Sequence, residues 1–344
     1  MIPGNVVVVG LGSIGERHVR NLLKLGQTDI TVVRRDAAKP PRTLRGTEFR
    51  TVTSLQAALE ARPAAVIVAN PTALHDEVVW CAVDAGIHVL LEVPASHAPE
   101  GLERAERRAR DTGARTVVAH NLRFHPALRA IHDAVHGGVI GQPLYTRAQF
   151  GEYLPACHSW EDYRGRYEAR ADLGGGVVLT SIHELDHAYW LCGPVAAVTC
   201  VARTVHFPID VEDVAMMILE HESGVLSEIE LDFVQRTYRR SLQVTGSEGT
   251  LEWELLGDRV RLFEARTGQW RDLIVLAGYD INETYLDELR HFAAVIRGEE
   301  SPHVDLAAAR HVLRVGLAAL QSSKQRCRVE IASGSIAQGA AAHA

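Results

Sequence analysis

The chain has 344 residues, of which 47% are hydrophobic and 23% are charged, and its formal net charge is −7. A chain of this size and apolar content can bury two ordinary hydrophobic cores, so two domains are expected. The acidic balance argues against a nucleic-acid partner, which would favour a clustered basic surface.

The first predicted element is a buried strand of four valines, Val6 to Val9, because β-branched residues suit strands. A glycine fingerprint follows and predicts a tight turn into a helix whose free N–H groups can hold a pyrophosphate. A nicotinamide or flavin dinucleotide is therefore the expected ligand. We assign to this pyrophosphate loop Gly10, Gly12, Ser13, Ile14 and Gly15.

The second apolar strand, residues 30–33, ends at Arg34 and Arg35, and Asp36 comes next. An acidic residue at this point would bind the ribose hydroxyls of NAD, whereas arginine suits the 2′-phosphate of NADP. The two arginines therefore favour NADP as the cofactor, and Asp36 keeps NAD open. Two surface arginines that bind nothing are the alternative.

Strands and helices alternate up to residue 122, which predicts a doubly wound parallel sheet of the Rossmann type. The further strands are expected at 65–69, 88–92 and 116–119, and the helices at 17–25, 54–61, 74–85 and 100–111. Residues 1–122 are therefore predicted to form a dinucleotide-binding domain.

The pattern changes after a helix at 128–135. Segments with alternating apolar residues follow, of which 228–232 and 251–255 are the clearest, with a turn at 245–249. Such one-faced strands predict an antiparallel sheet that packs one face on helices. Two amphipathic helices are expected at 285–297 and 306–320. We expect residues 123–333 to form a second α/β domain with a large open, mainly antiparallel sheet, and 334–344 to be a flexible tail.

The cysteines and the N-terminal residues both favour a protein of the cytoplasm. The first apolar run is too short to span a membrane, and no cationic segment precedes it as in a signal peptide. A cytoplasmic protein is therefore expected. The cysteines form no CxxC pair and are expected to be reduced: Cys81, Cys157, Cys192, Cys200 and Cys327.

Three polar segments follow predicted parallel strands, at the edge where open α/β sheets bind ligands. They are Asn70-Pro71-Thr72-Ala73-Leu74-His75, Glu92-Val93-Pro94 and Arg123-Phe124-His125-Pro126. Together with the glycine fingerprint, they closely resemble the Gfo/Idh/MocA family of NAD(P)-dependent oxidoreductases. The resemblance covers about residues 5–330.

The resemblance implies a nucleotide-binding domain and an open-sheet domain that often forms homodimers or homotetramers through its sheet. It also implies a sugar, cyclitol or other polyol derivative as substrate, with hydride passing between a ring carbon and the nicotinamide. It places the pyrophosphate at the glycine loop and the adenosine ribose at Arg34. The other cofactor-binding residues that follow from it are Asn70, Pro71, His75, Glu92, Pro94 and Arg123.

The sequence departs from the family at Val93, which stands where the family's Glu-Lys-Pro motif has lysine. In the family this lysine commonly assists proton transfer at the reacting hydroxyl. A valine side chain can neither donate nor accept a proton. The usual mechanism therefore cannot be carried over unchanged.

A glycine-rich segment, 173–176, leads to His183-Glu184-Leu185-Asp186-His187. His183 and Asp186 match the family's HxxD pair, in which the histidine faces the nicotinamide and the substrate. We expect His183 to be the acid/base, because imidazole titrates near neutral pH. A structural histidine is the alternative. The aspartate that many members carry before this histidine is absent, and Leu179 or Thr180 is its nearest counterpart.

The same residues satisfy the HExxH pattern of zinc peptidases, with His183 and His187 one helical turn apart. This pattern is only five positions long, and here it follows a complete dinucleotide-binding pattern. A metal hydrolase is therefore a remote alternative, and we assign no metal ligand. We expect His187 to lie beside the substrate.

Aromatic and cationic residues are dense between residues 152 and 170. Aromatic faces stack on sugar rings, and arginine can bind a carboxylate or a phosphate. Tyr163 or Tyr167 could supply the proton function that Val93 lacks, and His120 is a further candidate. A solvated loop or a subunit contact is the alternative. The expected substrate-binding residues here are Tyr153, His158, Trp160, Arg164 and Arg166.

Two hypotheses follow for the function. The first is an NAD(P)-dependent dehydrogenase or reductase that acts on a secondary alcohol or ketone of a sugar, nucleotide sugar, aminosugar, aminoglycoside or cyclitol. The second is a sensor or regulatory protein that binds NAD(P) without catalysis, for which Val93 is the main argument. Turnover of any such substrate would distinguish them.

Overall fold

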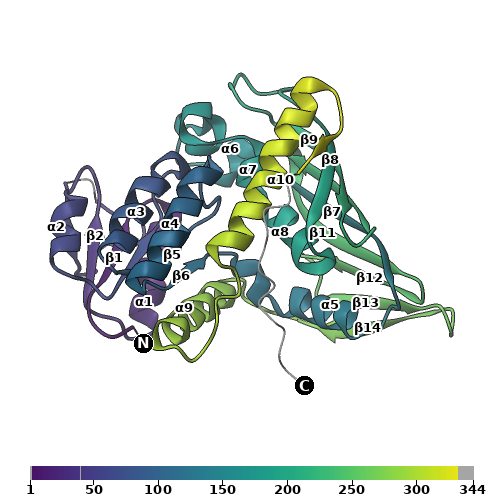
Figure 1. Ribbon diagram of the computed structural model, residues 1–344, viewed down its shortest axis with the longest axis horizontal. Coiled ribbons are helices and arrows are strands. Elements are labelled where there is room, and N and C mark those ends of the chain that lie inside the picture. Colours follow the sequence, from purple (N-terminus) through teal and green to yellow (C-terminus); the bar gives the residue numbers. More distant parts are fainter. Residues whose placement is uncertain (1, 39, 332–344) are drawn as a thin grey trace.

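The computed structural model of this chain describes residues 2–38 and 40–331. They form two sheets with their helices, and helices from the end of the chain lie between the sheets and beneath the first one (Figure 1). The expected tail, 334–344, falls outside the described residues. Among the described helices, none is both long and apolar enough to cross a membrane.

The first sheet has six parallel strands in the order β3-β2-β1-β4-β5-β6, which confirms the doubly wound prediction. Its strands are β1 (Val6–Val9), β2 (Ile30–Val33), β3 (Arg50–Val52), β4 (Ala65–Val68), β5 (His88–Leu91) and β6 (Thr116–Val118). Its helices are α1 (Ser13–Lys24), α2 (Leu55–Glu60), α3 (His75–Asp84) and α4 (Pro99–Thr112). The sequence analysis missed β3, because this three-residue strand lacks a buried apolar run.

The four valines of β1 serve two cores, because successive side chains of a strand point to opposite faces. Val6 and Val8 face a core that α9 (Asn282–Arg297) shares with α1. Val7 and Val9 face a second core, which α2, α3, α4 and α10 (Leu306–Gln325) complete. This two-sided burial explains why β1 is apolar throughout.

The second sheet has nine strands in the order β14-β13-β12-β11-β7-β10-β9-β8-β15. It is antiparallel except for the central pair β7 and β10, so the prediction of a large, mainly antiparallel sheet is confirmed. Its strands are β7 (Pro143–Tyr153), β8 (Val195–Arg203), β9 (Val214–His221), β10 (Leu226–Asp232), β11 (Val234–Gly246), β12 (Gly249–Glu254), β13 (Arg259–Glu264), β14 (Gln269–Val275) and β15 (Val329–Glu330).

Helices cover one face of the second sheet. They are α5 (Pro126–His136), α8 (Ile182–Cys192) and α10, and the short helices α6 (Leu154–Cys157) and α7 (Val177–Thr180) contact central strands of the sheet. The described residues also form five 3₁₀ turns: η1 (Thr72–Leu74), η2 (Asn121–Phe124), η3 (Tyr163–Gly165), η4 (Tyr167–Ala169) and η5 (Ala171–Leu173). The opposite face of the sheet is open and exposes the apolar side chains of Val201, Met216 and Ile218.

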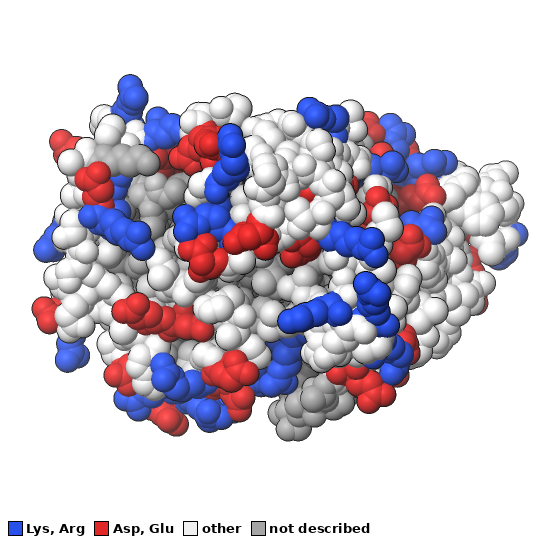
Figure 2. Space-filling view, turned by 90° about the horizontal axis from the view of Figure 1, so that it is seen from above, with Lys and Arg blue, Asp and Glu red and all other residues white. Residues whose placement is uncertain are grey.

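Helix α10 packs against both sheets and contributes to one core of each. Leu306, Ala309 and Leu313 pack with the first sheet, whereas Val312 and Val315 pack with the second. In Figure 1 this helix, drawn in yellow, stands between the two sheets. On the face seen in Figure 2, basic and acidic side chains are interspersed.

Candidate active site

A cavity of about 470 Å³ opens where the carboxyl ends of β1, β4 and β5 meet the second half of the chain. The first half contributes Gly10, Leu11, Gly12, Ser13, Ile14, Ala69, Asn70, Pro71, Thr72, His75, Glu92 and Val93 to its lining. The second half contributes His158, Glu161, Gly165, Arg166, Tyr167, Glu168, Leu173, Thr180 and His183. Segments predicted separately from the sequence therefore meet around one cavity.

The glycine loop has the shape that a dinucleotide requires. A Cβ atom on Gly10 would lie 2.6 Å from the Ala69 carbonyl oxygen, and one on Gly15 would lie 2.1 Å from the Gly10 carbonyl oxygen. A Cβ on Gly12 would meet no atom within 4 Å. The outer glycines thus allow close packing, and the middle one leaves open space in front of the N-terminus of α1, where a pyrophosphate would lie.

Two neighbouring groups add to this fit. The side-chain oxygen Oδ1 of Asn70 is buried in the cavity wall without a hydrogen-bond partner, so it can accept from a bound ribose or amide. The ring nitrogens of His75 lie 2.8 Å from the Asn70 carbonyl oxygen and 3.0 Å from the Pro94 carbonyl oxygen. His75 therefore ties the loop after β4 to the loop after β5.

Glu92 reaches the cavity from the end of β5. Its Oε1 lies 2.6 Å from His18 Nε2, and its Oε2 accepts a hydrogen bond from the backbone N–H of Val93 at 3.3 Å. Val93 itself lines the cavity with an apolar side chain and is joined to Pro94 by a cis peptide bond. Glu92 is thus the charged side chain that this loop presents to the cavity.

His183 enters the cavity from the start of α8, after the glycine-rich turn. That turn needs glycine at position 176, where φ is +102° and a Cβ would lie 2.4 Å from Glu212 Oε1. Burial lowers the pKa of His183 well below its usual value, and the electrostatic effects of the nearby His120 and Arg240 lower it further. The imidazole is therefore neutral at physiological pH and can accept a proton.

Comparison with known proteins identifies the family. Residues 4–120 match the model described as an oxidoreductase family with an NAD-binding Rossmann fold, and residues 128–252 match the GFO/IDH/MocA C-terminal domain. The chain belongs to the Gfo/Idh/MocA oxidoreductases. It is therefore an NAD(P)-dependent enzyme that acts on CH–OH groups, as its motifs predicted.

Individual relatives resemble the chain over most of its length. The scyllo-inositol 2-dehydrogenase (NAD(+)) of Bacillus subtilis (strain 168) is 27% identical, and the match covers 94% of this chain and 95% of that protein. The 1,5-anhydro-D-fructose reductase of Ensifer adhaerens is 28% identical over 78% of this chain and 80% of that protein. A levoglucosan dehydrogenase in complex with NADH has the same fold, with a TM-score of 0.86 at 20% identity, covering 95% and 99% of the two chains.

The HxxD pair of this Gfo/Idh/MocA oxidoreductase is divided between two tasks. His183 lines the cavity, whereas Asp186 is buried behind it and binds Arg123 through two hydrogen bonds of 2.9 Å and 2.7 Å. Burial raises the pKa of Asp186, but the Arg123 guanidinium outweighs it and holds this pKa below the usual range. The pair joins η2 to α8, so both residues support the site from behind.

The HExxH pattern has no zinc-site geometry in the part of the chain that the structure describes. Glu184, which would be the general base of a peptidase, is buried and paired with Arg240 at 2.7 Å. His187 is buried as well, and burial lowers its pKa to about 3. Within residues 2–38 and 40–331, neither of the two groups that bring three metal-ligating atoms together includes His183 or His187.

The aromatic and basic residues predicted as site residues between 152 and 170 fall into two sets. His158, Arg166 and Tyr167 line the cavity. The others pack elsewhere: Tyr153 lies under Arg236 at 3.7 Å, Trp160 under Arg42 at 3.8 Å, Tyr163 against Phe207 at 5.2 Å, and Arg164 bonds Asp162 at 3.0 Å. Arg166 is paired with Glu168, so its charge is already balanced within the protein.

The cofactor-specificity candidates lie at the end of β2. The backbone N–H of Arg34 donates to the Val52 carbonyl oxygen at 3.1 Å, and the side chain of Arg35 is exposed. Because β2 neighbours β1 in the sheet, both follow the strand next to the glycine loop.

Sequence reasoning missed three polar residues of the cavity wall, Glu161, Glu168 and Thr180, as binding residues. The two glutamates lie in the segment between 152 and 170 that is rich in arginine. Their carboxyl groups were the one sequence signal that could have marked them as polar residues of the site. It also missed Arg240 on β11, whose buried guanidinium binds Glu184. No local pattern marks a single arginine within a strand as part of a distant site.

Proposed function

We propose that this oxidoreductase moves hydride between the nicotinamide of NAD(P) and a secondary alcohol or ketone carbon of a sugar, cyclitol or related polyol. The observation that carries the proposal is that the dinucleotide cradle and His183 line the same cavity. The names of the inositol dehydrogenase and the anhydrofructose reductase support the substrate class. When bound, the nicotinamide supplies the hydride acceptor or donor.

His183 takes up the hydroxyl proton in the oxidation direction. Its Nδ1 is buried, so Nε2 is the ring nitrogen that we expect to take up the substrate proton. A secondary alcohol that gives up this proton and a hydride becomes a ketone, so His183 would account for the proton and the bound cofactor for the hydride. Reduction reverses both transfers.

Tyr167 takes over part of the role of the lysine in the family's Glu-Lys-Pro motif, which is to assist proton transfer at the reacting hydroxyl. It lines the cavity, and burial raises the pKa of its hydroxyl well above the usual value. The phenol therefore stays protonated and can donate a hydrogen bond to the substrate oxygen. Val93 would then only shape the wall.

A substrate panel tests the function. We expect absorbance changes at the nicotinamide wavelength with at least one inositol, anhydrosugar or aminosugar, using both NAD⁺ and NADP⁺, and with keto-sugars using the reduced cofactors. The apolar Val93 in the cavity favours a second candidate, a sensor that binds NAD(P) and turns nothing over. Tight binding of the reduced cofactor together with no rate on the whole panel would support the sensor.

The choice of cofactor gives a separate prediction. If Arg34 and Arg35 bind the 2′-phosphate, the double replacement of both with alanine should weaken NADPH binding by about tenfold or more, since a hydrogen bond to a charged group contributes about 1.5–3 kcal/mol. NADH affinity should stay nearly constant. Fluorescence titration of both cofactors measures this. Equal losses of affinity for NADPH and NADH would mean that the two arginines do not recognise the 2′-phosphate. Arg45→Ala, on the same loop, is the matched control.

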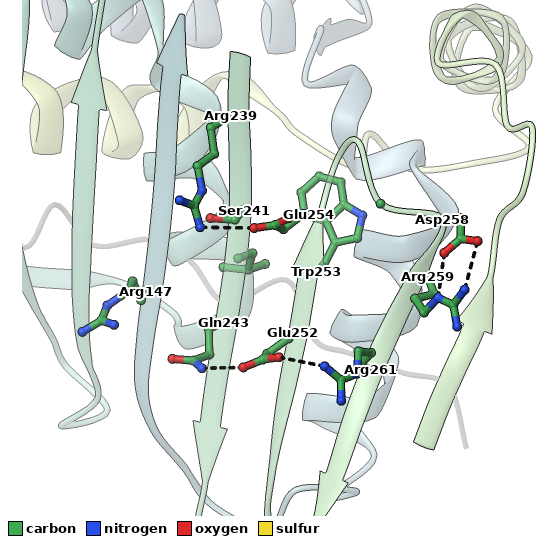
Figure 3. A pocket seen from close by; sticks show the side chains of 12 residues that line it. Arg147, Arg239, Ser241, Gln243, Glu252, Trp253, Glu254, Asp258, Arg259 and Arg261 are labelled. Carbon is green, nitrogen blue, oxygen red and sulfur yellow. Dashed lines mark hydrogen bonds and ion pairs between the residues drawn. The ribbon is translucent and has the colours of Figure 1, made fainter. Parts of the chain in front are cut away.

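The open face of the second sheet is proposed to bind a second copy of the chain. Its outward row crosses four strands as Arg147, Gln243, Glu252 and Arg261, and these residues border a hollow of about 460 Å³ (Figure 3). Ile218, 43% exposed, lies on the apolar part of the same face. Mixed charges beside an apolar patch suit a self-complementary contact.

Ile218→Arg should break this contact. We expect light scattering coupled to size exclusion to show a dimer or tetramer for the wild type and a monomer for the variant. Val139→Arg, at an exposed turn after α5 on the helix side of the sheet, should leave the mass unchanged. A monomeric wild type would contradict the proposal.

A further inference from the structure

A buried cluster of three ionisable side chains lies behind the cavity wall. Its members are His18 on α1, Glu92 after β5 and Glu288 on α9, and one nitrogen or oxygen of each lies within 4.8 Å of the other two. Glu92 reaches the cavity, whereas the side chains of His18 and Glu288 are fully buried. The site mechanism above uses neither His18 nor Glu288.

Glu288 is the unexplained member of this cluster. It has no exposed surface, and both of its carboxyl oxygens lack a hydrogen-bond partner. A bare buried carboxylate next to a second carboxylate is strongly unfavourable unless a proton or a cation accompanies it. Burial and the neighbouring Glu92 both raise the pKa of Glu288 well above its usual value.

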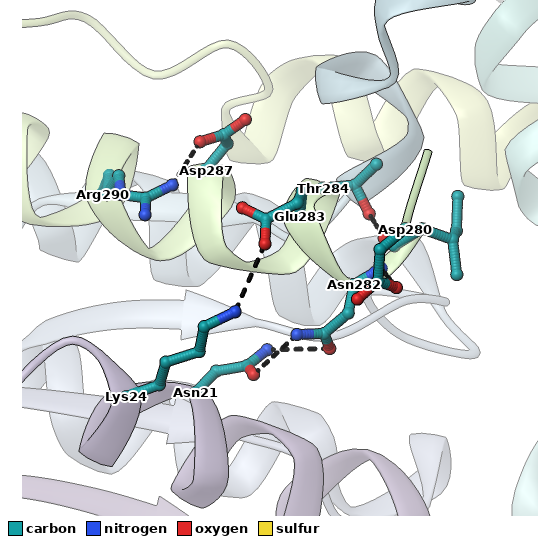
Figure 4. Close-up of polar contacts among 9 residues, drawn as sticks. Asn21, Lys24, Asp280, Asn282, Glu283, Thr284, Asp287 and Arg290 are labelled. Atoms are coloured by element: carbon teal, nitrogen blue, oxygen red, sulfur yellow. Dashed lines mark hydrogen bonds and ion pairs between the residues drawn. The ribbon is translucent and has the colours of Figure 1, made fainter. Parts of the chain in front are cut away.

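The position of Glu288 is fixed by contacts between α9 and the first domain. Figure 4 shows the amides of Asn21 and Asn282 bonded in both directions, at 3.2 Å and 3.0 Å, and Lys24 bonded to Glu283 at 3.3 Å. On the adjoining side, Asn121 donates to Thr284 at 2.8 Å. Glu288 lies one helical turn beyond Thr284, so the helix holds it against His18.

No arginine or lysine among the described neighbours pairs with Glu288, and the nearby His18 has its Nε2 2.6 Å from Glu92 Oε1 rather than on Glu288. On its own helix, burial raises the pKa of Tyr285 to about 12, so this hydroxyl is neutral. The guanidinium of Arg17 lies over the Tyr285 ring, 4.4 Å from its centroid. Arg240 on β11 is paired with Glu184, and Arg123 on η2 with Asp186. A proton is the remaining way to neutralise the group.

We propose that Glu288 is a positioning residue of the active site, which holds a proton inside the His18–Glu92–Glu288 cluster and thereby keeps a further negative charge from forming directly behind Glu92. The number of negative charges near this wall sets how strongly a positively charged, oxidised nicotinamide is favoured over a neutral, reduced one. The role in cofactor binding rests on the proposed function, whereas the buried proton can be measured without turnover.

Glu288→Gln tests the proton, because the amide keeps the shape of the acid but cannot ionise. A group whose pKa is raised by folding contributes stability that is complete below its unfolded pKa, about 4.3 for glutamate, and is lost as the pH rises through its folded pKa. We therefore expect the Tm of Glu288→Gln minus that of the wild type to grow by several degrees between pH 5 and pH 8. Asp287→Asn, on the exposed side of α9, should show no such growth.

Infrared spectroscopy reports the proton directly. The wild type at pH 7 should show the carbonyl stretch of a protonated carboxylic acid that shifts in D₂O, and Glu288→Gln should lack it. A missing band, or a Tm difference that does not change with pH, would overturn the proposal. One divalent metal ion per chain that disappears in the variant would overturn it as well, since a cation would then join the carboxylates.

Activity supplies the readout that a purely structural role would not change. At alkaline pH the wild type gains a second charge beside Glu92, so its kcat/KM and its preference for oxidised over reduced cofactor should change together. Glu288→Gln should lack this alkaline step, and an unaltered step in the variant would contradict the role of Glu288. If the panel shows no turnover, the pH dependence of the NAD⁺ to NADH affinity ratio tests the same point.

Discussion

Replacing His183 with alanine is expected to lower kcat by about 10²–10⁴-fold, which is the usual contribution of a positioned acid or base. The dissociation constant of the reduced cofactor should be nearly unchanged, because the variant leaves intact the glycine loop and Asn70, which we propose bind the cofactor. Steady-state kinetics and fluorescence titration on the same preparation separate the two quantities. An unchanged kcat would remove His183 from the mechanism.

The pH dependence of kcat/KM in the wild type tests whether His183 acts as a base. Since burial lowers the pKa of His183, the base form should persist into the acid range below the ordinary histidine value of about 6.5. Oxidation should therefore keep a flat kcat/KM through pH 7 and decline only at lower pH. His132→Ala, on α5 outside the cavity, is the control and should retain the wild-type rate and profile.

The second large effect is expected for Asp186→Asn. This change leaves the Arg123 guanidinium buried without its anion, and breaking a buried pair in this way costs about 3–5 kcal/mol of unfolding free energy. Denaturant unfolding monitored by circular dichroism measures the loss. Asp162→Asn, which breaks the exposed pair with Arg164, should leave the stability almost unchanged.

The loss should depend on pH in a defined direction. Because folding lowers the pKa of Asp186, its contribution is present above the unfolded value of about 3.9 and is lost as the pH falls through the folded value. The gap between wild type and variant should therefore narrow only under strongly acidic conditions. A gap that is constant through acidification would mean that the charge on Asp186 contributes nothing.

The first domain could be predicted from the sequence because its signals are local. The valines, the spacing of the glycines and the polar residues after each strand all act over a few positions, and the structure shows why: Gly10 and Gly15 have backbone atoms where a Cβ would be. The second sheet was harder to predict. Its central strands β7 and β10 are joined by a long crossover, so their pairing leaves no short-range pattern.

The cations between 152 and 170 illustrate a signal that was present but incomplete. Arg164 pairs with Asp162, Arg166 with Glu168 and Arg170 with Asp172, each two positions apart. Arginine alone suggested an anionic substrate, whereas the acidic partners in the same segment already balance the charge. Arg123 was similarly expected to contact the cofactor from its place after the strand predicted at 116–119, and its partner Asp186 lies 63 residues further along the chain.

Helix α10 contributes side chains to the core of the second sheet and to one of the two cores of the first sheet, so neither of these two cores is complete without it. Two units that share a helix lose its contacts together, which couples their unfolding into one cooperative transition. The same sharing limits how far the two walls of the cavity can separate. Substrate and cofactor should therefore enter by local motion of loops rather than by a hinge that swings whole domains apart.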